Sequence, residues 1–187
     1  FSLSRLCIEA DSDELTDTEN TQPALLTTSV AYLEHLRERL REVGTRLVPS
    51  LFAGHSLGQF SAAVAADSLP LADGLRLVRE RGRIMKEWAE RRPGGLATVF
   101  GLSREQLQEI CQQVSNQESV AVAVHNAPGQ YVISGDLAPL ERAMRLSRER
   151  GAGVKRLRIS VPGHTPAMQA AADEMERILA RTQFRDP

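Results

Sequence analysis

Hydrophobic residues recur every three to four positions over five long stretches of the chain, and they gather in short runs between these stretches. The helical spacing predicts helices over residues 21–40, 71–89, 103–114, 137–150 and 166–182, and a small-residue helix over 61–66. The short apolar runs predict strands over residues 47–53, 96–100, 120–125, 131–134 and 154–160. The acidic, polar segment 11–20 predicts a loop.

The predicted strand 47–53 leads into the sequence Gly-His-Ser-Leu-Gly at Gly54–Gly58, which the small-residue helix follows. A strand, a sharp Gly-x-Ser-x-Gly turn and a helix form the context of a nucleophile elbow. Glycine lacks a Cβ, so the chain can turn tightly and expose the Ser56 hydroxyl. The Leu57 N–H and the positive helix end could then stabilise an oxyanion. This arrangement predicts acyl transfer through a seryl ester, and an ordinary glycine turn is the alternative.

From residue 96 onward the predicted elements follow the order βαββαβ, which is that of a ferredoxin-like unit. The predicted fold class is therefore α/β, with a partial α/β-hydrolase-like core around the elbow and an inserted ferredoxin-like subdomain. Residues 1–95 and 161–187 would form parts of the large subdomain, and residues 96–160 would form the small one.

Four histidines could supply the base that a nucleophilic serine needs, and their contexts differ. His35 lies on a charged helix, which indicates a surface role. His55 directly precedes the serine and indicates a structural or pocket-lining role, whereas His125 ends a strand and indicates local packing. His164 lies in the turn between the last strand and the returning helix, and such loops often carry function. We favour His164 as general base, against the alternative of a surface histidine that caps the helix.

One charged residue falls on the apolar face of the predicted helix 71–89. Arg81 lies between Val78 and Met85 on the stripe of apolar residues, whereas the neighbouring arginines fall to its sides. A buried guanidinium needs an anion. That anion could be an internal Asp or Glu, or a substrate carboxylate held by the guanidinium fork. A dicarboxylic acyl group would fit the second interpretation.

Length, charge and cysteine content limit the function classes further. The chain has 187 residues, and its net charge of −1 argues against nucleic acid or an anionic membrane as the main partner. Cys7 and Cys111 indicate neither a disulfide framework nor a metal site, which favours a cytoplasmic location. No apolar stretch reaches membrane-span length and no signal peptide is visible. Because the chain begins at Phe1 and stops at Pro187 just after a helix, we expect an excerpt of a longer protein.

With these residues in view, the chain resembles the malonyl-CoA:acyl carrier protein transacylases and, more loosely, the acyltransferase domains of modular polyketide synthases. Five segments in the family's order carry the resemblance and span nearly the whole chain: Thr21–Leu26, Gly54–Ala62, Leu77–Met85, Asn126–Gln130 and Ser160–His164. Gln59 departs from the pattern, since the family usually has Glu there. We expect this change to perturb the surroundings of the elbow rather than its chemistry.

The resemblance implies a ping-pong transfer of malonyl from malonyl-CoA to the phosphopantetheine thiol of acyl carrier protein, without a cofactor or a metal. It implies two catalytic residues and four that bind the substrate: Ser56 and His164, then Leu57, Arg81, Gln22 and Asn126. Arg81 would hold the free carboxylate and so favour malonyl over acetyl. We expect a monomer.

Three other interpretations stay open. The chain could belong to a polyketide-type acyltransferase for methylmalonyl or another extender unit, or to a serine thioesterase or esterase with the same Ser–His pair. It could also be a non-catalytic fragment or binding module. The family's N-terminal strand with its Gly-Gln-Gly loop, and its C-terminal segment that orients the histidine, have no counterpart in this chain. Those differences favour the third interpretation.

Overall fold

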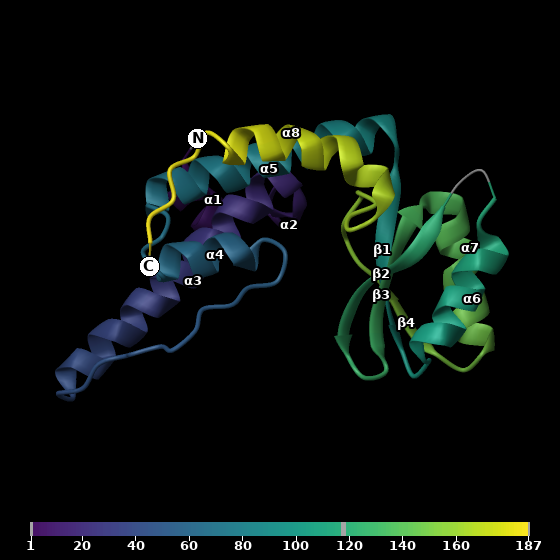
Figure 1. The fold of residues 1–187 in the computed structure, drawn as a ribbon, viewed down its shortest axis with the longest axis horizontal. Coiled ribbons are helices and arrows are strands. Elements are labelled where there is room, and N and C mark those ends of the chain that lie inside the picture. The colour runs from purple at the N-terminus through teal and green to yellow at the C-terminus, as the bar shows by residue number, and fades with distance from the viewer. Residues whose placement is uncertain (1, 117–118, 187) are drawn as a thin grey trace. The chain divides into compact units, whose positions relative to one another are not determined.

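The computed structural model describes residues 2–116 and 119–186, and it has a mixed α/β fold with a small antiparallel sheet (Figure 1). The chain divides into two compact units. The first unit comprises residues 1–83 and 175–187, and the second comprises residues 84–174. We describe each unit by itself.

The regular secondary structure in the described residues of the first unit is helical. Its helices are α1 (Leu3–Glu9), α2 (Ser12–Thr16), α3 (Thr18–Glu42), α4 (Gly58–Ala65), the first part of α5 (Leu71–Arg91) and the end of α8 (Gln169–Leu179). The core side chains Leu26, Leu69 and Val78 are almost fully buried. Gly74 lets α5 come close to this core, because a Cβ there would lie only 3.0 Å from the Val64 side chain. The helix predicted over residues 71–89 is confirmed, since α5 covers Leu71–Arg91.

The loop predicted over residues 11–20 is wrong, because this segment contains α2 and the start of α3. Asp11 caps α2 by accepting hydrogen bonds from the N–H groups of Asp13 and Glu14, at 3.0 and 2.7 Å. Asp17 caps α3 in the same way through the N–H of Glu19, at 3.1 Å. Acidic residues at these positions therefore begin helices instead of interrupting them. The first long helix starts at Thr18, three residues before the predicted start.

The strand predicted over residues 47–53 is also wrong. The segment is extended but belongs to no sheet, and Val48 and Leu51 are 70% and 80% exposed. A strand needs a neighbour that satisfies its backbone N–H and C=O groups. No segment within residues 2–116 and 119–186 pairs with this one. Its apolar pattern indicated a tendency to be buried but could not supply a partner.

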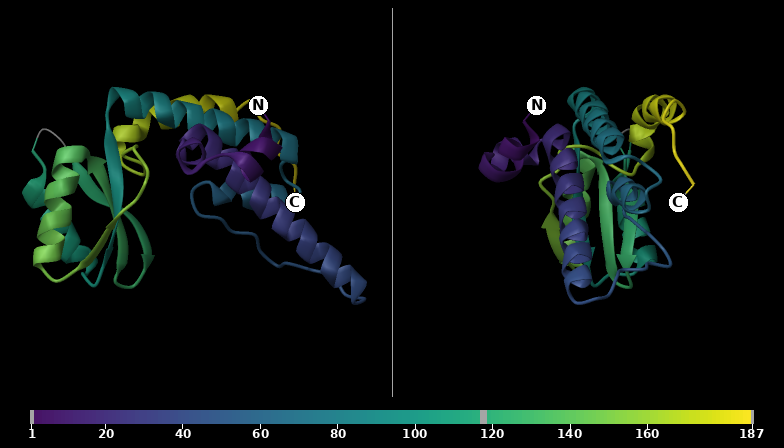
Figure 2. Two further views of the ribbon diagram at one scale, coloured as in Figure 1. Left: turned by 180° about the vertical axis from the view of Figure 1, so that it is seen from behind. Right: turned by 90° about the vertical axis from the view of Figure 1, so that its left-hand side faces the viewer.

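The second unit is built on a sheet with the strand order β2-β3-β1-β4, in which all neighbours are antiparallel. Its strands are β1 (Gly94–Phe100), β2 (Val120–Ala127), β3 (Gln130–Asp136) and β4 (Gly153–Arg156). Helices α6 (Arg104–Val114) and α7 (Leu137–Glu149) cover one face of the sheet (Figures 1 and 2). The predicted elements of this unit are confirmed, except that β4 ends at Arg156 and the returning helix begins with a 3₁₀ turn at Pro166–Met168.

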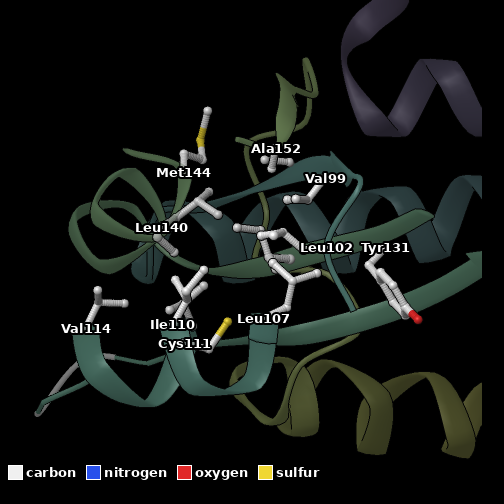
Figure 3. Close-up of a cluster of buried hydrophobic side chains, with 14 residues drawn as sticks. Val99, Leu102, Leu107, Ile110, Cys111, Val114, Tyr131, Leu140, Met144 and Ala152 are labelled. Carbon is white, nitrogen blue, oxygen red and sulfur yellow. The ribbon is translucent and has the colours of Figure 1, made fainter. Parts of the chain in front are cut away.

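The core of the second unit lies between the sheet and its two helices (Figure 3). Val99, Leu107, Ile110 and Leu140 have no exposed surface, and each contributes about 2 kcal/mol by leaving water. Ser103 starts α6 with a capping box, because its hydroxyl accepts from the N–H of Gln106 at 3.2 Å and the Gln106 side chain accepts in return. The predicted cap at Ser103 is thus confirmed.

A buried carboxylate fixes the end of the sheet. Asp136 accepts two hydrogen bonds from the Arg92 guanidinium and one from the Ser119 N–H, each at 2.7 Å. The Arg92 hydrogen bonds hold the pKa of Asp136 below its usual value, and the Ser119 N–H acts in the same direction. The ionised form is therefore favoured in the folded state.

Asp136→Asn should lower the free energy of unfolding by about 1–3 kcal/mol, because it leaves hydrogen-bond donors poorly satisfied. In the unsubstituted protein the carboxylate stabilises the fold fully above its unfolded pKa of about 3.9. This contribution is lost as the pH falls through the lower, folded pKa. Urea unfolding between pH 3 and pH 7 would measure both effects. Glu141→Gln, which removes an exposed pair with Arg156, is the control and should change stability by less than about 0.5 kcal/mol.

Candidate active site

The Gly-x-Ser-x-Gly segment forms a sharp turn in the first unit, directly before α4. The Gly58 N–H donates to the His55 carbonyl at 2.8 Å, and the Gln59 N–H donates to the Ser56 carbonyl at 3.2 Å. A Cβ at Gly54 would overlap the backbone of Gly58, so the first glycine is required by the turn. The second glycine is not, because a Cβ at Gly58 would meet no atom within 4 Å in the described residues.

Ser56 has an unusual backbone conformation. Its φ is +52°, in the left-handed region that costs a non-glycine residue about 1–3 kcal/mol. Among residues 2–116 and 119–186, three non-glycine residues have positive φ: Ser56, Asp67 and His164. Two of the three are the residues predicted as nucleophile and base. A strained residue persists only where the surrounding structure holds it in place. Such residues cluster at active sites and ligand-binding sites.

The Leu57 N–H is positioned as a hydrogen-bond donor next to the serine. Leu57 is the N-cap residue of α4, and within the described part of the chain its N–H donates to no acceptor. The first N–H groups of a helix have no partner inside the helix and lie at its positive end. An oxyanion formed on a group attached to Ser56 could therefore be stabilised there.

Arg81 reaches the serine from α5 (Leu71–Arg91). Its Nη2 donates to Ser56 Oγ at 3.1 Å, and its Nη1 donates to Gln22 Oε1 at 2.6 Å. Gln22 is 5% exposed and lies in the first turns of α3. The structure therefore brings together Ser56, Leu57, Arg81 and Gln22, which are four of the six predicted site residues.

The Arg81 guanidinium has two neutral partners and, within the described residues, no carboxylate partner. Burial lowers its pKa, and no acidic group raises it. A guanidinium nevertheless stays charged at neutral pH. The sequence analysis considered two partners for this charge, which is partly buried. The described residues do not provide the first of them, an internal Asp or Glu. A ligand carboxylate would compensate the charge.

A glycine that the sequence analysis did not single out allows the contact between Arg81 and Gln22. A Cβ at Gly82 would overlap the backbone of Thr18 and come within 2.7 Å of the Glu19 Cα. The Thr18 hydroxyl also donates to the Gly82 carbonyl at 3.1 Å. Gly82 thus lets α3 and α5 approach closely beside the site. The available signal was a glycine inside a helix, which costs stability unless packing requires it.

His164 and Asn126 belong to the second unit. His164 is exposed and has a φ of +61°, at the end of the buried segment Val161–Gly163. The Thr165 hydroxyl donates to the Pro162 carbonyl at 2.6 Å and closes this turn. Asn126 is exposed near the end of β2.

The surroundings of His35 and His125 are those that the sequence suggested, whereas the structural or pocket-lining role of His55 stays a prediction. His35 is exposed on α3. His125 stacks on Tyr131, its cross-strand neighbour, with 4.6 Å between the ring centroids. His55 is exposed in the turn beside Ser56.

Residues 2–116 and 119–186 contain no cluster of three His, Cys, Asp or Glu side chains that could hold a metal ion. None of the helices formed by these residues has the length and apolar character needed to cross a membrane.

Comparisons with known proteins show the family of the chain. The sequence model of the acyl transferase domain matches residues 1–187. The chain is 40% identical to a malonyl CoA-acyl carrier protein transacylase of Bacillus subtilis, over 98% of this chain and 57% of the relative. It is 37% identical to the protein of the same name from Haemophilus influenzae, over 100% of this chain and 59% of the relative.

Solved structures give the same result. The fold is similar to that of a malonyl-CoA:acyl carrier protein transacylase from Xanthomonas oryzae, with a TM-score of 0.90 and 39% identity over 99% of this chain and 58% of the other. A type II polyketide synthase acyl carrier protein in complex with its malonyl-transacylase also matches, with a TM-score of 0.88, 35% identity and coverages of 99% and 59%. The chain thus spans less than two thirds of the length of these relatives.

Proposed function

Because the chain belongs to the acyl transferase domain family, we propose that its protein transfers a malonyl group from malonyl-CoA to an acyl carrier protein through an ester on Ser56. The relatives at 40% and 37% identity bear the corresponding name. The carrier is proposed as acceptor because one similar structure holds an acyl carrier protein with its malonyl-transacylase.

In the proposed first half-reaction, the Ser56 hydroxyl attacks the thioester carbonyl of malonyl-CoA while His164 takes its proton. The Leu57 N–H stabilises the oxyanion of the tetrahedral intermediate. The carbon–sulfur bond then breaks, and His164 returns the proton to the leaving CoA thiolate. In the second half-reaction, His164 deprotonates the carrier thiol, which attacks the Ser56 ester, and the serine recovers its proton.

The observation that carries the proposal is the position of Arg81. Its guanidinium touches Ser56 Oγ and has no carboxylate partner among the described residues. In a malonyl ester, one methylene separates the ester carbonyl from the free carboxylate. An arginine that reaches Oγ can therefore also reach that carboxylate and hold it with a charge-assisted pair of hydrogen bonds. An acetyl group would leave this partly buried cation without an anion.

The fold supports the proposal at the level of architecture. We interpret the second unit as a ferredoxin-like subdomain, because β1-α6-β2-β3-α7-β4 follows the βαββαβ order. The elbow and its helices would be part of an α/β-hydrolase-like core, with boundaries near residues 95 and 160. The reaction written above needs no cofactor. A monomeric state and a cytoplasmic location remain predictions.

The first experiment is intact-protein mass spectrometry of the complete gene product mixed with malonyl-CoA, and separately with acetyl-CoA. We expect a malonyl adduct and at most about one tenth as much acetyl adduct. An adduct that passes to a phosphopantetheinylated carrier protein supports transfer. Adduct lost only to water indicates a thioesterase or esterase instead, and no adduct at all contradicts the proposal. Methylmalonyl-CoA is tested as a third substrate, because the contact with Arg81 alone would not distinguish malonyl from methylmalonyl. A preference for methylmalonyl would indicate an acyltransferase for that extender unit.

A further inference from the structure

The segment that leads to His164 is packed on the first residues of β1 in the second unit. Val161 is 2% exposed, Pro162 is fully buried and Gly163 is buried, whereas His164 itself is exposed. The Leu157 N–H donates to the Leu96 carbonyl at 2.9 Å, and the Gly94 N–H donates to the Ser160 carbonyl at 3.5 Å. The chain between β4 and His164 therefore follows β1 to its first residue.

Gly94 is the point of closest approach between β1 and this segment. A Cβ at Gly94 would lie 2.7 Å from Pro162 Cβ, 2.8 Å from Pro162 Cδ and 2.7 Å from the Gly135 carbonyl oxygen. Real Cβ atoms do not approach other heavy atoms so closely, so either β3 or the Pro162 turn would have to move. The absence of a side chain at Gly94 thus lets Pro162 sit directly on the sheet.

The sheet side of this contact is held firmly. Gly95 pairs with Gly135 and Gly94 with Asp136 in the β1–β3 register. The Gly135 backbone has no room to move away from Gly94, because it packs closely on Ser119. Even a Cβ on Gly135 would overlap the Ser119 carbonyl oxygen. Arg92 and the Ser119 N–H hold the next residue, Asp136, through three hydrogen bonds of 2.7 Å each. A group added at Gly94 would therefore displace the Pro162 turn rather than the strand.

We propose that Gly94 is a positioning residue for His164, because it lets the Pro162 turn seat against β1 and so fixes the histidine two residues further on. This inference rests on the proposed role of His164 as general base. The left-handed conformation of His164 makes its side-chain direction depend on the turn before it. A displacement of about 1 Å in a catalytic group can cost roughly 100-fold in rate.

The test compares Gly94→Ala with Gly153→Ala in the complete gene product. Gly153 is the matched control, because it also lies in the sheet but a Cβ there would have its nearest neighbour at 3.7 Å. For Gly94→Ala we expect kcat of malonyl transfer to fall by about 10- to 100-fold with KM within about 2-fold. For Gly153→Ala we expect both constants to stay within about 2-fold.

The second readout is the NMR signal of the His164 imidazole, assigned with His164→Gln and titrated between pH 5 and pH 9. Gly94→Ala should shift the His164 signal but leave the signals of His35 and His55 unchanged. An unchanged His164 signal and kcat would overturn the proposal, as would equal effects of Gly94→Ala and Gly153→Ala. A protein that forms no malonyl adduct would count against the proposed function, while the NMR comparison would still decide the role of Gly94.

If circular dichroism shows that Gly94→Ala does not fold, Pro162→Ala takes its place. This change keeps the Cβ of residue 162 but removes the proline ring atoms that pack on Gly94. The turn therefore loses part of its contact with β1, and no added atom overlaps the strand. We expect kcat to fall by about 3- to 10-fold and the His164 signal to shift. A Pro162→Ala protein with an unchanged His164 signal would overturn the proposal.

Discussion

Ser56→Ala should abolish formation of the malonyl adduct and lower carrier malonylation by at least about 10⁴-fold. In the proposed transfer the hydroxyl oxygen of Ser56 forms the covalent bond, and no other serine of the described residues has the strained conformation of Ser56, with φ at +52°. The substitution also changes the packing around residue 56 little, because Ser and Ala differ by one oxygen. The loss should therefore appear in chemistry rather than in stability. Intact mass and carrier malonylation measure it directly.

Ser61→Ala is the matched control for this prediction. Ser61 lies on α4, one turn beyond the elbow, and the same atom is removed. We expect Ser61→Ala to keep adduct formation within about 2-fold of the unsubstituted protein. An adduct that persists in Ser56→Ala would move the nucleophile to another residue. Equal loss in both variants would indicate that the elbow had been disturbed rather than its nucleophile removed.

The second unit could be predicted from the sequence because its elements find their partners within the described residues. Each strand of its sheet pairs with another strand of the same unit, and the apolar faces of α6 and α7 close over one core. Periodicity then suffices, since the buried face and its cover are both encoded locally. The strand predicted over 47–53 failed for the opposite reason. Its pattern is equally apolar, but hydrogen bonding in a sheet depends on a neighbour that the pattern cannot specify.

The helices at the N-terminus of the chain were missed for a more local reason. Asp11 and Asp17 were interpreted as loop residues because acidic, polar segments are common in loops. Their carboxylates instead accept from backbone N–H groups two or three residues further on, which is the geometry of a helix N-cap. The spacing of three residues between Asp11 and Glu14 is that of a capping box and carried this signal for α2.

The candidate site shows the same division between local and distant information. Ser56 and Leu57 could be identified from one pentapeptide, because turn and helix are adjacent in sequence. Arg81 could be identified as a misplaced charge on an apolar stripe. Its contact with Gln22 could not, since it joins two helices about sixty residues apart and depends on their close approach at Gly82. The family resemblance pointed to Gln22 as a site residue, but it did not predict the contact of Gln22 with Arg81.

Arg81→Ala should lower kcat/KM for malonyl-CoA by about 10³-fold while leaving the rate with acetyl-CoA unchanged or higher. The guanidinium donates a hydrogen bond to Ser56 Oγ at 3.1 Å, so it lies beside the atom that would carry the acyl group. With malonyl it would gain a charge-assisted partner, and with acetyl it would remain partly buried without one. The ratio of the two rates therefore reports the carboxylate contact more cleanly than either rate alone.

Two further variants make this prediction specific. Arg81→Lys keeps the charge but loses the planar fork, so it should recover only part of the preference for malonyl. Arg76→Ala, on the same helix, removes an exposed arginine that pairs with Asp73 at 2.7 Å, and it should leave both rates within about 2-fold. If Arg81→Ala lowered both thioester rates equally, its role would be to hold the Ser56 hydroxyl in place. The preference for a dicarboxylic acyl group would then have to come from other residues than Arg81.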